Sequence, residues 1–285
     1  MSDMKSHPPR AAAVHDLSGF GRCSLTVVLP VLSAMGVQLS CLPTAVLSTH
    51  TGGFKGYTFR DLTGDMRAFF HHWKKEGLQF DALYTGYLGS AEQIDLVEEF
   101  FSLFRTEDNL ILVDPVMGDH GKLYSLYTPE MAQGMKRLCA RADVVVPNMT
   151  EAAFLTGTEF QADGHDERYL RSLCEKLLEM GAKKVVLTGA SPVPGTVGAA
   201  CHDGTNFSVY APCRVQAHYD GTGDLFASVL LGALLHGRTL PDSAVLAADF
   251  TRDCVEISLK NGTDSHHGVD FEGMLWKLGK QIFEE

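Results

Sequence analysis

Short apolar runs alternate with longer amphipathic segments along most of this chain, and this alternation restricts the folds open to it. The short runs have the composition of buried strands. The longer segments carry apolar residues at helical spacing. A strand followed by a helix, repeated along the chain, is typical of a parallel sheet with right-handed crossovers. We therefore predict an α/β fold that is doubly wound, with a mainly parallel central sheet flanked by helices.

The elements of this fold can be placed on the sequence. The predicted strands are Ala11–Val14, Val37–Leu42, Ala82–Tyr84, Leu110–Val113, Val144–Val146 and Lys184–Leu187. The predicted helices are Cys23–Met35, Asp61–Lys75, Ala91–Phe104, Pro129–Ala140, Glu167–Met180, Gly223–His236, Ser243–Leu259 and Phe271–Phe283. A late β-hairpin is predicted from Gly198–His202 and Phe207–Tyr210, which flank a turn-forming segment. With no linker or internal repeat in view, we expect a flexible N-terminus over 1–10 and a single domain over 11–285.

One glycine turn combines several features of an anion site. Gly221, Thr222, Gly223 and Asp224 directly precede an apolar run, Leu225–Leu235. A helix that is apolar on all sides is buried, and its first N–H groups have no intrahelical partner and attract anions. Asp224 can cap this helix, which is the usual use of Asp at such a position. It can also be a general base beside a bound phosphate.

Acidic and amide side chains follow two of the predicted strands, Leu110–Val113 and Val144–Val146. They are Asp114, Asp119, Asn148 and Glu151. Ligands of doubly wound sheets bind outside the carboxyl ends of the strands, so these side chains are expected to converge there. Hard oxygen ligands of this kind suit Mg²⁺. The alternative is that Asp114 belongs to a turn while Asn148 and Glu151 cap a helix.

Composition excludes some classes of partner. The formal net charge is −11, whereas a nucleic-acid or anionic-membrane surface needs clustered Lys and Arg. No apolar window is long enough to span a bilayer, and residues 1–10 are polar and lack the apolar core expected of a signal sequence. The seven cysteines include no C-x-x-C pair, a pattern typical of reduced thiols in the cytoplasm. There is no P-loop, and the adjacent pairs His71-His72 and His266-His267 are interpreted as surface residues.

Three segments, taken in order, resemble the ribokinase superfamily. They are Asp114-Pro115-Val116-Met117-Gly118-Asp119, Pro147-Asn148-Met149-Thr150-Glu151-Ala152 and Gly221-Thr222-Gly223-Asp224-Leu225-Phe226. Thr85-Gly86-Tyr87, Ser48-Thr49-His50-Thr51-Gly52 and Tyr127 make the chain most similar to the pyridoxal/pyridoxamine kinase branch. The resemblance extends from about Ala11 to Leu259.

This resemblance implies an ATP-dependent kinase that phosphorylates the 5′-hydroxymethyl group of a B6 vitamer with Mg²⁺, as a cytoplasmic homodimer. A requirement for K⁺ is left open. Asp224 would be the catalytic base, and Gly221, Thr222 and Gly223 would form the anion hole. The other implied roles are ATP binding by Asp114, Asn148, Glu151, Thr188 and Thr222, metal binding by Asp119 and Glu151, and vitamin binding by Asp16, Ser18, His50, Thr51 and Tyr87. The glycine-rich segment Thr49–Gly56 is expected to fold over the substrate.

One departure leaves the acceptor open. Pyridoxal kinases often carry a Ser just after the first strand, where this chain has Asp16, and Ser18–Gly36 is similar to hydroxymethylpyrimidine kinases, a sister branch. A hydroxymethylpyrimidine kinase is therefore the first alternative. A non-catalytic protein that binds a vitamin or a nucleotide is the second, and the intact Asp224 counts against it.

Overall fold

The predicted α/β architecture is confirmed in a computed structural model that describes residues 7–124 and 127–284. The strands are β1 (Arg10–Ser18), β2 (Gln38–Leu47), β3 (Phe59–Asp61), β4 (Ala82–Thr85), β5 (Leu110–Val113), β6 (Gly118–Asp119), β7 (Lys122–Leu123), β8 (Val144–Val145), β9 (Lys184–Ala190), β10 (Gly198–His202) and β11 (Phe207–Tyr210). The main sheet has the order β11-β10-β9-β8-β5-β4-β1-β2-β3. Neighbours from β2 to β9 are parallel, whereas β3, β10 and β11 add antiparallel edges.

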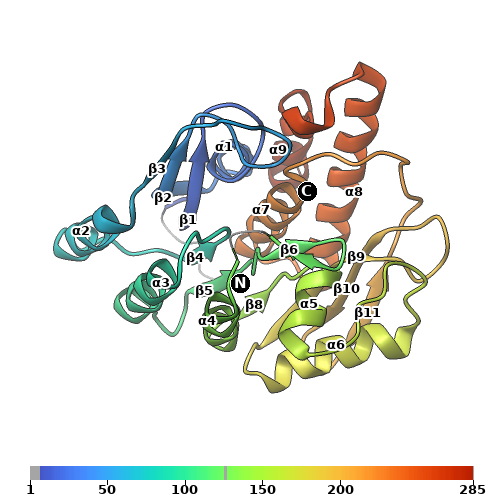
Figure 1. Ribbon diagram of the computed structural model, residues 1–285, viewed down its shortest axis with the longest axis horizontal. Coiled ribbons are helices and arrows are strands. Elements are labelled where there is room, and N and C mark those ends of the chain that lie inside the picture. Colours follow the sequence, from blue (N-terminus) through green and yellow to red (C-terminus); the bar gives the residue numbers. More distant parts are fainter. Residues whose placement is uncertain (1–6, 125–126, 285) are drawn as a thin grey trace.

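Helices cover both faces of this sheet (Figure 1). They are α1 (Leu25–Ala34), α2 (Thr63–Lys75), α3 (Ala91–Phe104), α4 (Pro129–Ala140), α5 (Met149–Thr156), α6 (Glu167–Glu179), α7 (Thr222–Leu235), α8 (Leu240–Asn261) and α9 (Leu275–Phe283). One apolar core lies between the sheet and α1, α7, α8 and α9, and a second lies under α2 to α6. Along β1, Ala11 and Ala13 enter the first core while Ala12 and Val14 enter the second, because strand side chains alternate between faces.

The strand order reverses beside β1, and this places the binding crevice. From β1 the chain first adds β2 on one side, and later strands extend the sheet from β4 on the other side. Such a switch point leaves a crevice at the carboxyl ends of the strands. The segments that follow β1, β4 and β5 open into this region. None of the helices within residues 7–124 and 127–284 has the length and apolar character needed to cross a bilayer.

The first two strands are longer than predicted. β1 extends through Ser18 and pairs with β2 as far as Leu47, so Asp16 and Ser18 lie on a strand and not in the loop after it. The pairing register shifts between His15 and Leu17, opposite Pro43, which has no N–H to donate to the ladder. Arg10, predicted to belong to the flexible N-terminus, begins β1, and residues 1–6 lie outside the described residues.

The short elements β3, β6, β7 and α5 were not predicted. The edge strand β3 is exposed throughout and so has no apolar periodicity. Strands β6 and β7 form a hairpin with a two-residue turn. The turn residues His120 and Gly121 have φ of 50° and 75°, and a type I′ turn requires positive φ at both positions. Helix α5 has only eight residues. The late hairpin β10–β11 is confirmed, and α8 begins at Leu240 instead of the predicted Ser243.

Candidate active site

The N-terminus of α7 is not capped by a side chain. Gly221 is the N-cap residue, with φ 77°, and among the described residues no side-chain hydrogen bond closes this end. The first backbone bond of the helix runs from the Leu225 N–H to the Gly221 carbonyl. The N–H groups of Thr222, Gly223 and Asp224 therefore have no hydrogen-bond acceptor within the helix. Behind them, residues 225–233 are buried, as predicted from their apolar character.

The Asp224 carboxylate points away from its own helix. Its Oδ2 accepts a hydrogen bond from the Ser24 N–H at 2.8 Å, and its side chain is 15% exposed. Burial raises the pKa of Asp224 to about 7, although the Ser24 N–H lowers it. A carboxylate with this pKa can both take and release a proton near neutral pH. The geometry thus disfavours the capping alternative for Asp224 and leaves it free to act as a base.

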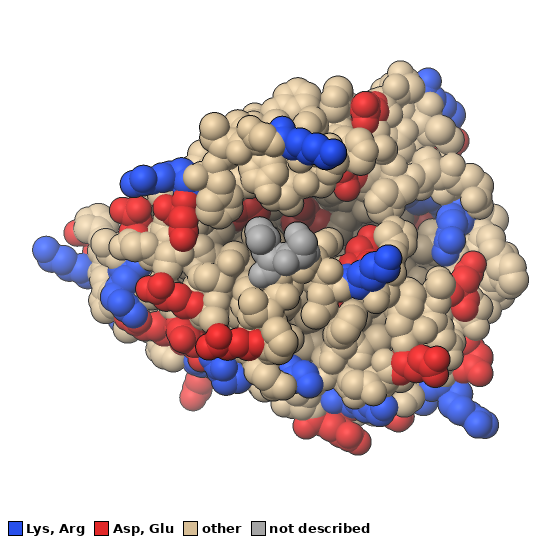
Figure 2. All heavy atoms as spheres, in the orientation of Figure 1, with Lys and Arg blue, Asp and Glu red and all other residues tan. Residues whose placement is uncertain are grey.

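Two more carboxylates lie buried at the same edge of the sheet. Asp114, directly after β5, is 6% exposed, and Glu151 on α5 is 3% exposed. Burial raises the pKa of Asp114, and the negative charges of Glu151 and Asp224 raise it further. The three carboxylates are therefore close enough for their charges to influence one another. In Figure 2 the face shown is hollowed near its centre, and acidic side chains lie in the hollow.

Asn148 and Glu151 form a capping box on α5. The Asn148 side chain accepts the Glu151 N–H at 2.9 Å, and Glu151 Oε2 accepts the Asn148 N–H at 2.8 Å. Glu151 Oε1 accepts the Met117 N–H at 3.0 Å. The Asn148 amide donates to the Gly118 carbonyl at 2.9 Å, and Thr188 donates its N–H to Pro147. The capping alternative is therefore observed here, and it also ties the β6–β7 hairpin to α5.

Asp119 occupies the exposed end of the site. Its Oδ1 accepts the His120 N–H at 2.7 Å, and its side chain is 42% exposed. Ligand atoms of Asp119, His120 and His218 all lie within 4.8 Å of one another. The second carboxylate oxygen of Asp119, Oδ2, lies 3.5 Å from His120 Nε2 and is of the kind that Mg²⁺ prefers. Glu151 already accepts two backbone hydrogen bonds, so its remaining lone pairs fit contact with the metal through water.

On the other side of Asp224, a further buried acid, Asp16, organises the end of β1. Asp16 is 6% exposed and accepts hydrogen bonds from the Ser24 hydroxyl at 2.6 Å and the Ser18 hydroxyl at 3.1 Å. Burial raises the pKa of Asp16, whereas these hydroxyls lower it. Ser24, in the left-handed region at φ 54°, thus joins Asp16 to Asp224. Sequence reasoning missed Ser24, which it placed in the first turn of the predicted helix Cys23–Met35.

The predicted covering loop packs through His50. The Gly52 N–H donates to His50 Nδ1 at 3.2 Å, so Nε2 carries the proton and donates to the His266 carbonyl at 2.7 Å. The His50 ring also meets Phe54 edge to face at 5.0 Å between ring centres. The Thr49–Gly56 segment therefore rests on the loop that contains His266. Thr51 is exposed, and the half-buried Tyr87 follows β4.

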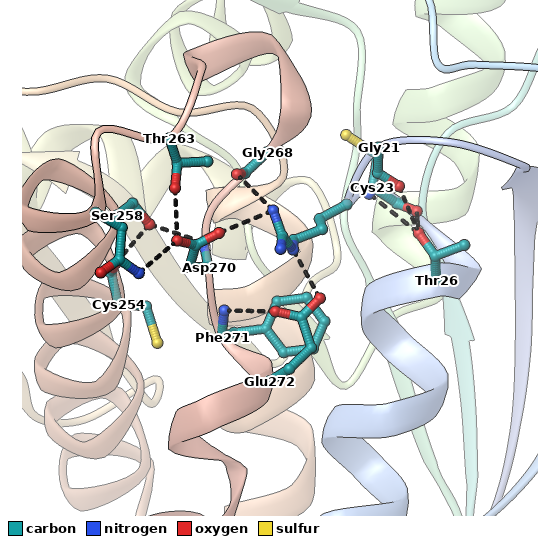
Figure 3. A network of polar contacts seen from close by, with 12 residues as sticks. Gly21, Cys23, Thr26, Cys254, Ser258, Thr263, Gly268, Asp270, Phe271 and Glu272 are labelled. Carbon is teal, nitrogen blue, oxygen red and sulfur yellow. Dashed lines mark hydrogen bonds and ion pairs between the residues drawn. The ribbon is translucent and has the colours of Figure 1, made fainter.

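Arg22 holds the loop after β1 beside the glycine turn. Its guanidinium forms ion pairs with Asp270 at 2.9 Å and Glu272 at 2.7 Å, in the network of Figure 3. A Cβ atom on Gly221 would lie 1.9 Å from the Arg22 carbonyl oxygen. The turn is therefore packed directly against the Arg22 backbone, and only glycine fits at position 221. Nothing in the sequence near Arg22 indicated a partner so distant along the chain.

Comparison with known proteins agrees with this geometry. Residues 30–270 match the model of the phosphomethylpyrimidine kinase family. A candidate phosphomethylpyrimidine kinase from Bacteroides thetaiotaomicron, solved with pyridoxal, is 40% identical with a TM-score of 0.90, over 95% of this chain and 96% of that one. Pyridoxal kinase from Lactobacillus plantarum is 32% identical with a TM-score of 0.87, over 95% and 96%. The predicted resemblance to pyridoxal kinases is thereby confirmed.

The sister branch is similar as well. The hydroxymethylpyrimidine/phosphomethylpyrimidine kinase of Bacillus subtilis strain 168 is 31% identical over 195 residues, which are 68% of this chain and 69% of that protein. The similarities therefore agree on a kinase and differ in the heterocycle named as its acceptor.

Proposed function

Because this chain belongs to the phosphomethylpyrimidine kinase family, we propose that it is a kinase of B6 vitamers. In this proposal the γ-phosphoryl group of ATP is transferred to the 5′-hydroxymethyl group of pyridoxal, pyridoxamine or pyridoxine. The observation that carries the proposal is the uncapped start of α7, where a carboxylate with a raised pKa stands beside free backbone N–H groups. This arrangement suits an alcohol that attacks a phosphoryl group.

The proposed chemical step uses Asp224 and the glycine turn. Asp224 takes the proton of the vitamin hydroxyl while the hydroxyl oxygen bonds to the γ-phosphorus. The bond between that phosphorus and the β–γ bridging oxygen breaks, and ADP leaves. The N–H groups that begin α7 stabilise the charge on the transferred group. Thr222, whose hydroxyl donates to the Tyr219 carbonyl at 3.3 Å, supports the turn.

The remaining site residues are proposed to bind the two substrates. Asp119 would hold Mg²⁺ with Glu151 acting through water, and the ion would neutralise phosphate charge. Asn148, which follows β8, and Thr188, which lies within β9, would position the phosphates, with Asp114 nearby. The vitamin ring would lie among Asp16, Ser18, His50, Thr51 and Tyr87. The homodimer, the cytoplasmic location and any use of K⁺ stay predictions of the resemblance to pyridoxal kinases.

A kinase of hydroxymethylpyrimidine is the second candidate function. The family model and the B. subtilis relative favour it, whereas the relative solved with pyridoxal and the L. plantarum pyridoxal kinase support a B6 vitamer over a larger share of the chain. Both candidates use the same base and the same anion hole. They differ in the ring that must fit beside Asp16.

A single assay separates these candidates. Purified protein is given ATP, Mg²⁺ and, in parallel, pyridoxal, pyridoxamine, pyridoxine or hydroxymethylpyrimidine, and ADP release is measured. We expect the largest kcat/KM with a B6 vitamer. A larger kcat/KM with hydroxymethylpyrimidine would replace the first candidate by the second. Tight vitamer binding with no ADP release would identify a binding protein instead of an enzyme.

A further inference from the structure

His15 is a buried side chain that the proposed chemical step does not use. It lies on β1, is 0% exposed, and meets the Tyr84 ring edge to face at 4.5 Å between ring centres. Within the described part of the chain, neither of its ring nitrogens has a hydrogen-bond partner. Leaving buried polar atoms unpaired costs free energy, so a group of this kind in a native fold calls for an explanation.

The ring of His15 faces the proposed base. Its Nδ1 lies 3.8 Å from Asp224 Oδ1, while the other carboxylate oxygen of Asp224 accepts the Ser24 N–H. The backbone of Gly86 makes room for the ring, because a Cβ atom there would lie 2.1 Å from His15 Cε1. The sheet thus holds an unpaired imidazole against the oxygen of Asp224 that accepts no N–H from residues 7–124 and 127–284.

The charge of His15 fits the role of a donor. Burial lowers the pKa of His15 to about 3, so the ring is neutral near pH 7 and carries a single N–H. Hydrogen bonds of catalytic groups are often long before substrate binds and shorten in the complex. A movement of less than about 1 Å would bring the two atoms to hydrogen-bond distance.

We propose that His15 is a positioning residue for Asp224, an inference that rests on the proposed function. With substrate bound, the Nδ1–H of His15 donates to Asp224 Oδ1 and fixes the plane of the carboxylate toward the attacking hydroxyl. The substrate proton goes to Asp224, and His15 keeps its own proton throughout. The titratable groups that otherwise face Asp224 are Asp16, Cys23, Tyr84, Asp114 and Tyr124.

The kinetic test replaces the donor and keeps the ring. His15→Phe retains a flat ring above Gly86, and His15→Gln retains an N–H donor. We expect His15→Phe to lower kcat at least tenfold with the KM for ATP within twofold. As the pH is lowered, the kcat of His15→Phe should begin to fall at a higher pH than the kcat of the wild type. Without the donor, the ionised form of Asp224 is less stable and its pKa is higher. His15→Gln should restore most of the lost kcat and most of the wild-type pH dependence.

A matched control separates this role from packing. His202 on β10 is also buried, and it accepts the Gly204 N–H at 3.0 Å. His202→Phe should alter stability and leave the pH dependence of kcat unchanged. A His15→Phe variant with kcat within twofold of the wild type and the same pH dependence would overturn the proposal.

A second measurement does not depend on turnover. ¹⁵N NMR of the imidazole in the wild type with pyridoxal and a non-hydrolysable ATP analogue should show His15 protonated at Nδ1, and Asp224→Ala should lose this preference. Protonation at Nε2 in both proteins would refute the proposed hydrogen bond. Absence of phosphorylation by the wild type would instead refute the proposed function, so the two failures are distinguishable.

Discussion

Helices α5 and α7 begin at the same edge of the sheet with an acidic residue at their third position, yet the two acids do different things. Glu151 of α5 closes a capping box with Asn148 and accepts a further N–H from Met117. Asp224 of α7 accepts nothing from its own helix and reaches the Ser24 N–H instead. A glycine replaces the capping side chain at Gly221. An acid whose two oxygens accept backbone N–H groups around its helix start, as in Glu151, is held first as a cap, whereas Asp224, which its own helix does not use, is free to act as a base.

Asp224→Ala should give the largest effect on turnover. Loss of a general base lowers kcat by roughly 10²–10⁴, and the affinity for ATP should stay within about threefold because the anion hole is backbone. Steady-state kinetics and calorimetric ATP titration measure the two quantities. A near-normal kcat would show that Asp224 is not the base. The acid on α7 would then have no chemical role that the acid on α5 lacks.

Gly221→Ala should disturb the α7 start through the backbone. Its φ of 77° and the Arg22 oxygen at 1.9 Å from the added Cβ force the turn to move. We expect kcat to fall roughly 10²-fold as N–H donors leave the transferred group. Gly157, which ends α5 at φ 65° with open space around it, is the matched control. Gly157→Ala should cost about 1 kcal/mol of stability and leave kcat unchanged.

Glu151→Ala should lower stability, besides removing the proposed water-mediated contact with Mg²⁺. The N–H groups of Asn148 and Met117 would lose their acceptor, which lowers the free energy of unfolding by about 2 kcal/mol. Urea denaturation measures this loss. The control is Glu130→Ala, because Glu130 lies in the first turn of α4, where no capping box is observed. A Glu151→Ala protein as stable as the wild type would show that the α5 acid is not a cap.

The pH dependence of stability provides a smaller contrast. Burial raises the folded-state pKa of Asp224 to about 7 from 3.8. Between these values the folded state binds more protons than the unfolded state, so this group lowers stability as pH rises. Asp224→Asn cannot ionise. Its stability relative to the wild type should therefore increase between pH 4 and pH 7, which urea denaturation at several pH values will measure. An equal difference across that range would be inconsistent with the raised pKa.

Local signals predicted the fold and part of the site. The apolar runs indicate strands whose side chains are buried on both faces of the sheet. The glycines around Thr222 indicate a turn before a buried helix. Exposed β3 and the eight-residue α5 carry too little periodicity to be found in this way. The bond from Ser24 to Asp224 joins residues 200 positions apart, and the approach of His15 to Asp224 joins β1 to the first turn of α7. Such contacts have no local signal.

The pH dependence of kcat in the wild type and in Asp224→Asn tests the central claim most directly. The account predicts that wild-type kcat with a B6 vitamer falls about tenfold per pH unit below pH 7, because protonated Asp224 cannot act as a base. Asp224→Asn should show a much lower kcat without this acid limb. If the kcat of Asp224→Asn also fell below pH 7, as in the wild type, the base would be another group and the account would be contradicted.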